Sequence, residues 1–151
     1  MEEPTNFGRQ IGILARLWRT ELDNQLRPIG LSQARWVLLV HLHEAPSGLA
    51  QHDLAVRAGV TGPTLVRQID RLEDAGLVAR QEDAHDRRIK RVYITGDGEA
   101  MFREVDAIAS TLRRQVLAEE DSADVEAAME LMHRLIRRFD ALTKPVAEGA
   151  A

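Results

Sequence analysis

The sequence lacks features on which several classes of protein depend. None of its 151 residues is a cysteine, which excludes disulfide bonds, thiolate zinc sites and thiol redox sensors. No apolar run approaches the roughly 18 residues that a membrane-spanning helix requires. The acidic, polar opening MEEPTNFG differs from a secretory signal. We therefore expect a cytoplasmic protein of one domain, residues 1–151, without membrane association.

The side-chain patterns of catalysis are missing as well. The sequence shows no pairing of a nucleophile with a base, no phosphate-binding loop and no cluster of metal ligands. The five histidines are dispersed, and His41 and His43, two positions apart on an expected helix, point to different sides. The sequence thus predicts no enzyme activity, no catalytic residue, no cofactor and no metal site.

Acidic residues outnumber basic ones overall, by 24 to 20, but positive charge is concentrated in one place. The formal net charge is −4, yet the segment HDRRIKRVYIT at 85–95 carries four cations within five consecutive positions. The overall acidity disfavours nonspecific binding to nucleic acid. It does not oppose a local basic patch, because electrostatic fields in salt act over about 8–10 Å.

Most of the chain is expected to be helical. Apolar residues recur at spacings of three and four over 6–27, and Pro28 and Gly30 end this helix. Ser32 can cap a second helix through its hydroxyl. Two stripes in 97–143 follow, Met101, Val105, Ile108, Leu112 and Val116, then Val125, Met129, Met132, Ile136, Phe139 and Leu142.

These terminal stripes offer more apolar surface than one small core would use. We expect the helices of 6–27 and 97–143 to interlock two chains in an obligate homodimer, whose interface would resemble a core cut in half. The alternative is an ordinary helical core within one chain.

The middle of the chain, residues 51–76, fits a helix-turn-helix. A short first helix ends before Gly59, which supplies a left-handed turn. Thr61 can cap the second helix, and Pro63 lies in its first turn, where a missing N–H costs nothing. The inward residues of the second helix are Leu65, Ile69 and Leu72. Any helical hairpin with a glycine turn is the alternative.

The outward face of this second helix carries side chains suited to base edges. Thr64, Arg67, Gln68 and Arg71 follow one another at spacings that place them on one side of the helix. Arginine can bridge guanine O6 and N7, and glutamine can bridge adenine N6 and N7. The alternative is a solvated surface on which the arginines pair with nearby acids such as Asp70, Glu73 or Asp74.

Two candidate strands, 77–81 and 91–95, flank the basic segment. A helix-turn-helix followed by a β-hairpin is a winged helix, whose basic tip would lie over a minor groove. Asp86 can pair with a neighbouring guanidinium and fix its direction. A solvated charged loop is the alternative. The predicted fold is mainly α with a small β-hairpin wing (α+β), with the winged helix-turn-helix at 32–95.

The sequence resembles the MarR family of bacterial winged-helix regulators, within it the SlyA-like branch. The matching runs are RLWRTELDNQLRPIGLSQARWVLL, QHDLAVRAGVTGPTLVRQIDRLEDAGLVAR and DRRIKRVYIT. The resemblance implies a homodimer joined by its terminal helices, a recognition helix at 62–75 and a wing at 82–91. Arginines matching Arg67 and Arg88 would contact the major and minor groove, and the aspartate matching Asp86 would steady the wing.

The resemblance also implies a small aromatic effector, such as salicylate, that weakens DNA binding from a cleft between the dimerisation helices and the DNA-binding lobe. Tryptophans and nearby cations suit an aromatic acid, and the candidate effector residues are Arg16, Trp18, Arg19, Trp36 and His43. SlyA-like proteins commonly carry histidine where Val40 stands, and the family usually has leucine where Ile94 stands.

The predicted function is a transcription regulator, a repressor or an antirepressor, that binds a pseudo-palindromic operator in double-stranded DNA. The predicted DNA-binding residues are Thr61, Pro63, Thr64, Arg67, Gln68, Arg71, Asp86, Arg87, Arg88 and Arg91. The alternative is a winged-helix protein-interaction module that does not bind DNA, which the cations of the wing and of the second helix disfavour.

Overall fold

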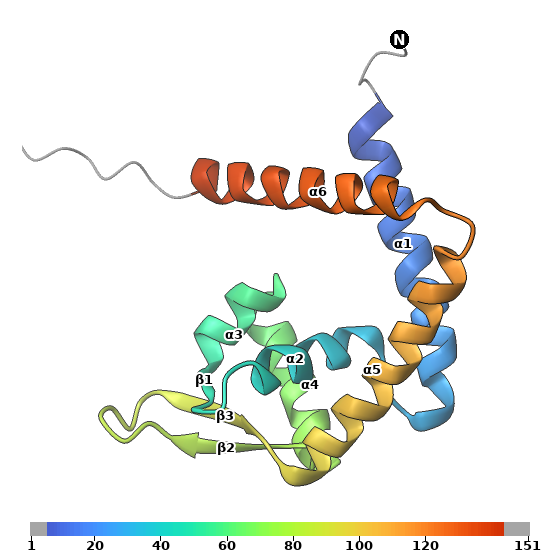
Figure 1. The fold of residues 1–151 in the computed structure, drawn as a ribbon. Helices are drawn as coiled ribbons and strands as arrows, with labels where there is room; N and C mark the ends of the chain where they lie inside the picture. The colour runs from blue at the N-terminus through green and yellow to red at the C-terminus, as the bar shows by residue number, and fades with distance from the viewer. Residues whose placement is uncertain (1–5, 144–151) are drawn as a thin grey trace, which may run out of the picture. The chain divides into compact units, whose positions relative to one another are not determined.

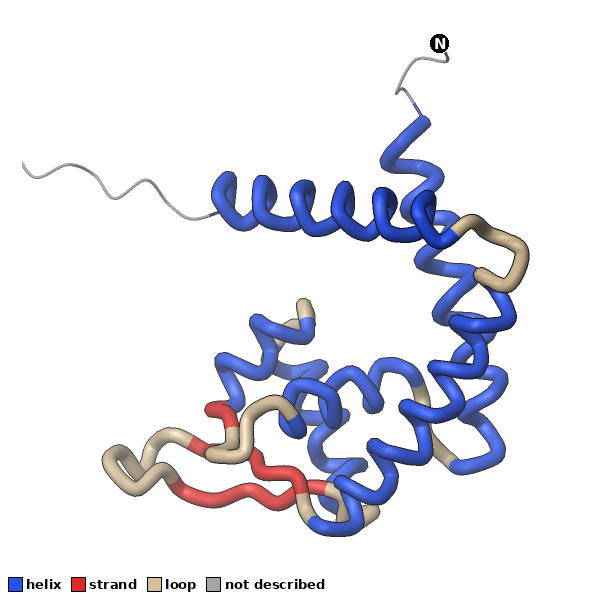
Figure 2. Tube along the Cα trace, in the orientation of Figure 1, coloured by secondary structure: helices blue, strands red, loops and turns tan. Residues whose placement is uncertain are grey.

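The computed structural model of the chain describes residues 6–143. Contacts divide the chain into two compact units, of which the first ends at Leu112 and the second begins at Arg113. Figure 1 labels the elements, and Figure 2 distinguishes helices from strands. In chain order they are α1 (Phe7–Leu26), the short 3-10 helix η2 (Arg27–Ile29), α2 (Gln33–His43), β1 (Leu49–Ala50), α3 (Gln51–Ala58), α4 (Gly62–Asp74), β2 (Val78–Glu82), β3 (Lys90–Ile94), α5 (Gly96–Val116) and α6 (Ser122–Thr143).

The core of the first unit is built mainly from leucine. Every α-helix from α1 to α5 contributes to it, and so do β2 and β3. Burying an aliphatic side chain of this size contributes roughly 1.5–3 kcal/mol, so this core dominates the stability of the unit. The largest fully buried side chains are Leu22, Leu26, Leu38, Leu39, Leu42, Leu54, Leu65, Ile69, Leu72, Val92 and Val105.

The apolar stripe of α1 is used unevenly. Its last turns enter the core through Leu22 and Leu26, which are fully buried. Its first turns leave Phe7, Ile11 and Leu14 exposed at 45%, 48% and 60%. Hence the amphipathic pattern of this helix exceeds what the core of its own unit covers.

The start of α2 differs from the sequence-based expectation. Ser32 is the N-cap residue, but its hydroxyl makes no capping hydrogen bond. The Gln33 N–H donates instead to Asp23 Oδ1 of α1 at 2.6 Å, and Ser32 Oγ accepts from Arg35 Nε at 3.2 Å. A carboxylate accepts more strongly than a hydroxyl, and this one also joins α1 to α2.

The helix-turn-helix forms as expected. Helix α3 ends at Gly59, which has a φ of 65°, and the Thr61 hydroxyl caps α4 by accepting from the Thr64 N–H at 3.4 Å. Leu65, Ile69 and Leu72 are all buried against the core. One apolar side of α4 is thereby fixed, which determines where its other sides point.

The wing belongs to a three-stranded antiparallel sheet rather than to an isolated hairpin. The strand order is β1-β3-β2, and β1 pairs Leu49 with Val92 of β3. The sequence did not predict β1, because two residues carry no alternation. Gly48 precedes it with a φ of 71°, and a Cβ there would lie 2.7 Å from the Tyr93 ring, so this turn requires glycine.

Helices α5 and α6 carry the two C-terminal apolar stripes. Along α5, Val105 and Leu112 are buried, whereas Val116 in the second unit is 50% exposed. Along α6 the exposed large apolar side chains range from 39% to 79%: Met129, Leu131, Met132, Ile136, Phe139 and Leu142. None of the helices between residues 6 and 143 is long and apolar enough to cross a membrane.

Candidate nucleic-acid interface

The outward face of α4 presents two arginines without ionic partners. Arg67 and Arg71 are exposed and Thr64 is half-buried. The Arg67 Nε–H donates only to its own helix, to the Pro63 carbonyl at 3.4 Å. Within residues 6–143 neither arginine forms an ion pair. Both guanidinium groups keep donors that can bind a base edge or a phosphate.

Two of the three acids of α4 are occupied elsewhere, and the third, Asp74, forms no ion pair with Arg71 among the described residues, which disfavours the alternative of a self-neutralised surface. Arg80 of β2 donates from Nη2 to Asp70 Oδ1 and from Nη1 to Glu73 Oε2, both at 2.6 Å. These carboxylates lie on a different side of the helix from Arg67 and Arg71. Helix α4 therefore has three sides: an apolar side toward the core, an acidic side toward β2, and a cationic side toward solvent.

Gln68 lies at the margin of the outward face rather than at its centre. It is half-buried, and its carbonyl oxygen is shielded from solvent with no partner among the described residues. The cause is its position directly before the buried Ile69 and three residues after the buried Leu65. Thr61 and Pro63, at the start of the helix, are exposed.

Asp83 organises the loop of the wing. Its Oδ1 accepts the His85 N–H at 2.8 Å and the Asp86 N–H at 3.2 Å, and its Oδ2 accepts Arg91 Nε at 2.7 Å. The Arg91 bond and the His85 N–H lower the Asp83 pKa to about 2 from the ordinary 3.8. The stability that ionised Asp83 contributes to the fold is thus fully present above the ordinary pKa of 3.8 and is lost only as pH falls toward 2.

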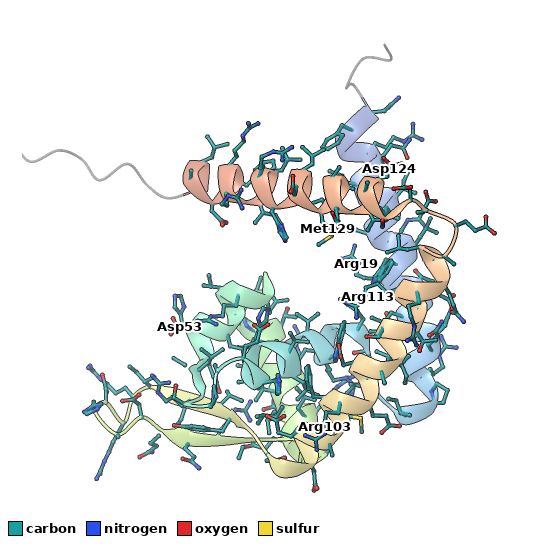
Figure 3. All side chains as sticks on the ribbon, viewed as in Figure 1. Arg19, Asp53, Arg103, Arg113, Asp124 and Met129 are labelled. Carbon is teal, nitrogen blue, oxygen red and sulfur yellow. The ribbon has the colours of Figure 1, made fainter. Side chains whose placement is uncertain are left out.

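Asp86 holds the guanidinium of Arg88. Arg88 Nε donates to Oδ1 at 3.0 Å and Nη2 donates to Oδ2 at 2.8 Å, and the Arg88 backbone N–H also donates to Oδ1. The side-chain bond from Arg88 keeps the pKa of Asp86 below its usual range. The Arg88 side chain is still 90% exposed, at the end of the hairpin where side chains project in Figure 3. The wing thus carries an oriented and accessible arginine.

Arg91 has a different environment from the other wing cations. Its Nη1 donates to the Gly48 carbonyl at 2.9 Å and the Ser47 carbonyl at 3.3 Å, in addition to the Asp83 bond. These bonds connect the wing to the turn before β1, and the predicted contact of Arg91 with DNA stays a prediction. Arg87 is exposed at the tip, and Lys90 pairs with Glu82 at 3.1 Å.

The five candidate effector residues lie on α1 and α2. Arg16 and Arg19 are exposed on α1, where Figure 3 labels Arg19, and the two tryptophans are half-buried against the core. His43 is engaged, since its Nδ1 lies 2.8 Å from Glu99 Oε2 and its ring stacks on Phe102 at 4.1 Å. Two open cavities of about 410 and 350 Å³ are lined by other residues, from α3, α4 and the hairpin.

Sequence reasoning missed two residues that shape this interface, Arg80 and Asp83. Arg80 lies in a predicted strand, but its side-chain partners are 7 to 29 residues away in the sequence. Asp83 follows that strand, and its ionic partner Arg91 lies across the hairpin. One indication of the Arg80 contact is present in the sequence. Asp70 and Glu73 lie three residues apart on one side of the expected recognition helix, and such a pair of acids favours a cation from another element.

The arrangement of these elements defines the class: a winged helix-turn-helix with a basic wing. The MarR family model matches residues 29–89. The crystal structure of transcriptional regulator PA3341 is 37% identical, with a TM-score of 0.79, and the match covers 89% of this chain and 98% of that chain. The chain belongs to the MarR family.

Two further structures show how widely this fold is shared. The transcriptional regulator SlyA is 26% identical, with a TM-score of 0.80, over 89% of this chain and 94% of that chain. A point mutant of MarR from E. coli, complexed with operator DNA, is 21% identical, with a TM-score of 0.79, over 87% of this chain and 94% of that chain. The predicted family and fold class are confirmed, and the SlyA-like branch stays a prediction.

Proposed function

We propose that the chain is a homodimeric regulator that binds a specific pseudo-palindromic site in double-stranded DNA through α4 and the wing. The observation that carries this proposal is the distribution of ion pairs. Arg80 pairs with Asp70 and Glu73 of α4, so these two acids do not neutralise the cations of the outward face, and Asp86 orients Arg88 without covering it. A surface that only needed to be charged and solvated would not require these separate arrangements.

We assign the recognition of base edges to α4 and the recognition of minor-groove width to the wing. Thr64, Arg67 and Arg71 would lie in the major groove, while Arg88 would enter a neighbouring minor groove, whose narrow A·T-rich form attracts arginine. A mutant of E. coli MarR with the same fold forms a complex with operator DNA, which supports DNA binding by this fold.

The exposed apolar faces of α1 and α6 support dimerisation. A chain that leaves Phe7, Ile11 and Leu14 of α1 exposed, and Ile136 and Phe139 of α6 exposed at 57% and 66%, has more apolar surface than a monomer usually carries. A second copy of the chain can cover such faces, because an isologous interface pairs the same surface on both partners.

The dimer should persist at sub-micromolar concentration, since an interface built from terminal helices behaves as part of the core. Sedimentation velocity at that concentration should give a single species with the mass of two chains. Ile136→Asp should shift the equilibrium toward monomer and lower the melting temperature. A folded monomer with a normal melting transition in the unsubstituted chain would contradict the proposal.

A small aromatic acid is proposed as the effector. The Nε1 atom of Trp36 is buried and lacks a hydrogen-bond acceptor among the described residues, and leaving such a donor unpaired is costly. A ligand with an apolar ring and an acceptor would satisfy that N–H. A carboxylate would also compete with Glu99 for His43, which gives binding a route to disturb the contact between α2 and α5.

Selection of bound sites from random DNA duplexes, with and without salicylate, tests the proposed function. The enriched sites should be palindromic, with half-sites about one helical turn or roughly 10 bp apart, and with A·T-rich flanks. Salicylate should reduce the bound fraction without changing the enriched sequence. Absence of any enriched sequence would overturn the DNA-binding proposal, whereas enrichment that salicylate leaves unchanged would overturn only the effector.

A further inference from the structure

A single arginine connects the recognition helix to the wing. Besides its bonds to Asp70 and Glu73, Arg80 donates from Nε to Gln51 Oε1 of α3 at 2.8 Å and from Nη2 to the Val66 carbonyl at 3.3 Å. Its backbone N–H donates to Glu73 Oε1 at 2.9 Å. We name Arg80 with these four partners, Gln51, Val66, Asp70 and Glu73, the Arg80 cluster.

The guanidinium of Arg80 is used almost entirely inside the protein. A guanidinium has five N–H donors, and Nε, Nη1 and Nη2 all donate within the Arg80 cluster. Only 20% of the side chain is exposed. Burial alone would lower the Arg80 pKa, but hydrogen bonds and charges of Asp70 and Glu73 outweigh burial and raise it. The side chain therefore has little capacity left for a phosphate.

Arg80 contacts only one side of α4. Val66, Asp70 and Glu73 follow one another at spacings of four and three, so they share a side of the helix. The apolar side is held by core packing, which resists separation but is not directional. The bonds from Arg80 are charge-assisted and directional, so they set the rotation of α4 about its own axis.

We propose that Arg80 is a positioning residue for DNA recognition, which holds α4 in a fixed rotation relative to the hairpin. The inference rests on the proposed function. Because β2 carries both Arg80 and one side of the wing, the outward face of α4 and the tip of the wing are held as one rigid unit. The major-groove and minor-groove contacts can then form together without a separate ordering cost for each.

The conservative variant Arg80→Lys separates positioning from charge. Lysine keeps the positive charge but lacks the planar fork that binds two carboxylates at once. We expect the ratio of operator affinity to random-duplex affinity to fall roughly tenfold, as when a bidentate base contact is lost. Random-duplex affinity and its salt dependence should stay unchanged, because Arg80 makes no phosphate contact.

The double variant Asp70→Asn, Glu73→Gln tests the acidic residues of the Arg80 cluster. Removing two negative charges close to DNA should strengthen binding to any duplex if electrostatics alone decides. With Arg80 as a positioning residue, random-duplex binding should strengthen while operator discrimination falls.

The matched control for Arg80→Lys is Arg103→Lys, the same substitution at an exposed arginine of α5 (Figure 3). It should alter neither random-duplex affinity nor operator discrimination.

The measurements are equilibrium titrations of each folded dimer against operator and random duplexes over a range of salt, with the melting temperature recorded beside them. An unchanged discrimination ratio in Arg80→Lys would overturn the inference, even if the melting temperature fell, because Arg80 would then only stabilise the fold. A loss of random-duplex affinity as large as the loss of operator affinity would also overturn it, since Arg80 would then contribute a contact that is independent of sequence. If the unsubstituted chain shows no preference for any duplex, the proposed function itself fails.

Discussion

Asp86→Ala will weaken binding of the chain to its operator, although the substitution removes a negative charge beside the phosphates. In the structure both oxygens of Asp86 accept from the Arg88 guanidinium. This fork holds an exposed side chain that would otherwise sample many rotamers, and ordering such a side chain on binding costs free energy. Loss of the aspartate should therefore weaken binding, because the free energy lost with the fixed orientation of Arg88 exceeds the free energy gained by removing a negative charge.

A double-mutant cycle of Asp86→Ala and Arg88→Ala at fixed salt measures this coupling. Each single variant should weaken operator binding, Arg88→Ala the more strongly, and the two losses should fall short of additivity by roughly three- to tenfold, as for residues in direct contact. Asp53→Ala is the matched control, because Asp53 is an exposed carboxylate on α3 (Figure 3). Its loss should strengthen binding slightly.

Tighter binding by Asp86→Ala, or strict additivity of the two losses, would contradict the orienting role. The wing would then act as a positive patch alone, and its arginine would read no groove width. The result for Asp53→Ala separates the two accounts, since a purely electrostatic wing predicts the same sign of change for both aspartates.

The helix-turn-helix could be predicted from sequence because its signals are local. Gly59 marks the turn, Thr61 and Pro63 mark the start of α4, and the spacing of Leu65 and Ile69 fixes its buried side. Each of these signals acts within a few residues, so no tertiary information was needed. The pairing of Asp86 with Arg88 was predictable for the same reason, as the two residues lie two positions apart.

The features that could not be predicted from sequence depend on contacts between separate elements. The bond from Gln33 to Asp23 replaced the expected cap of Ser32, because α1 brings a stronger acceptor to that N–H. The bond from Arg91 to the Gly48 carbonyl was not predicted, because that turn lies across the sheet; the predicted contact of Arg91 with DNA stays a prediction. Charge pattern alone cannot distinguish a cation that braces a loop from one that faces solvent.

Arg67→Ala is expected to remove base discrimination rather than overall attraction to DNA. Arg67 lies on the side of α4 that faces neither the core nor Arg80, and no carboxylate of the described residues neutralises it. A bidentate contact to guanine contributes roughly 1–3 kcal/mol of discrimination. A homodimer would lose this amount once in each half-site, which makes the effect on operator binding large.

The most direct test of the central claim, that the outward face of α4 reads bases, compares the unsubstituted chain with Arg67→Ala on the selected operator and on its single-base variants. The account predicts that the unsubstituted chain discriminates against a changed base at one position of each half-site, and that Arg67→Ala binds both sequences equally. If Arg67→Ala instead loses the same affinity for every duplex and keeps full discrimination, Arg67 is a phosphate contact and the claim is wrong.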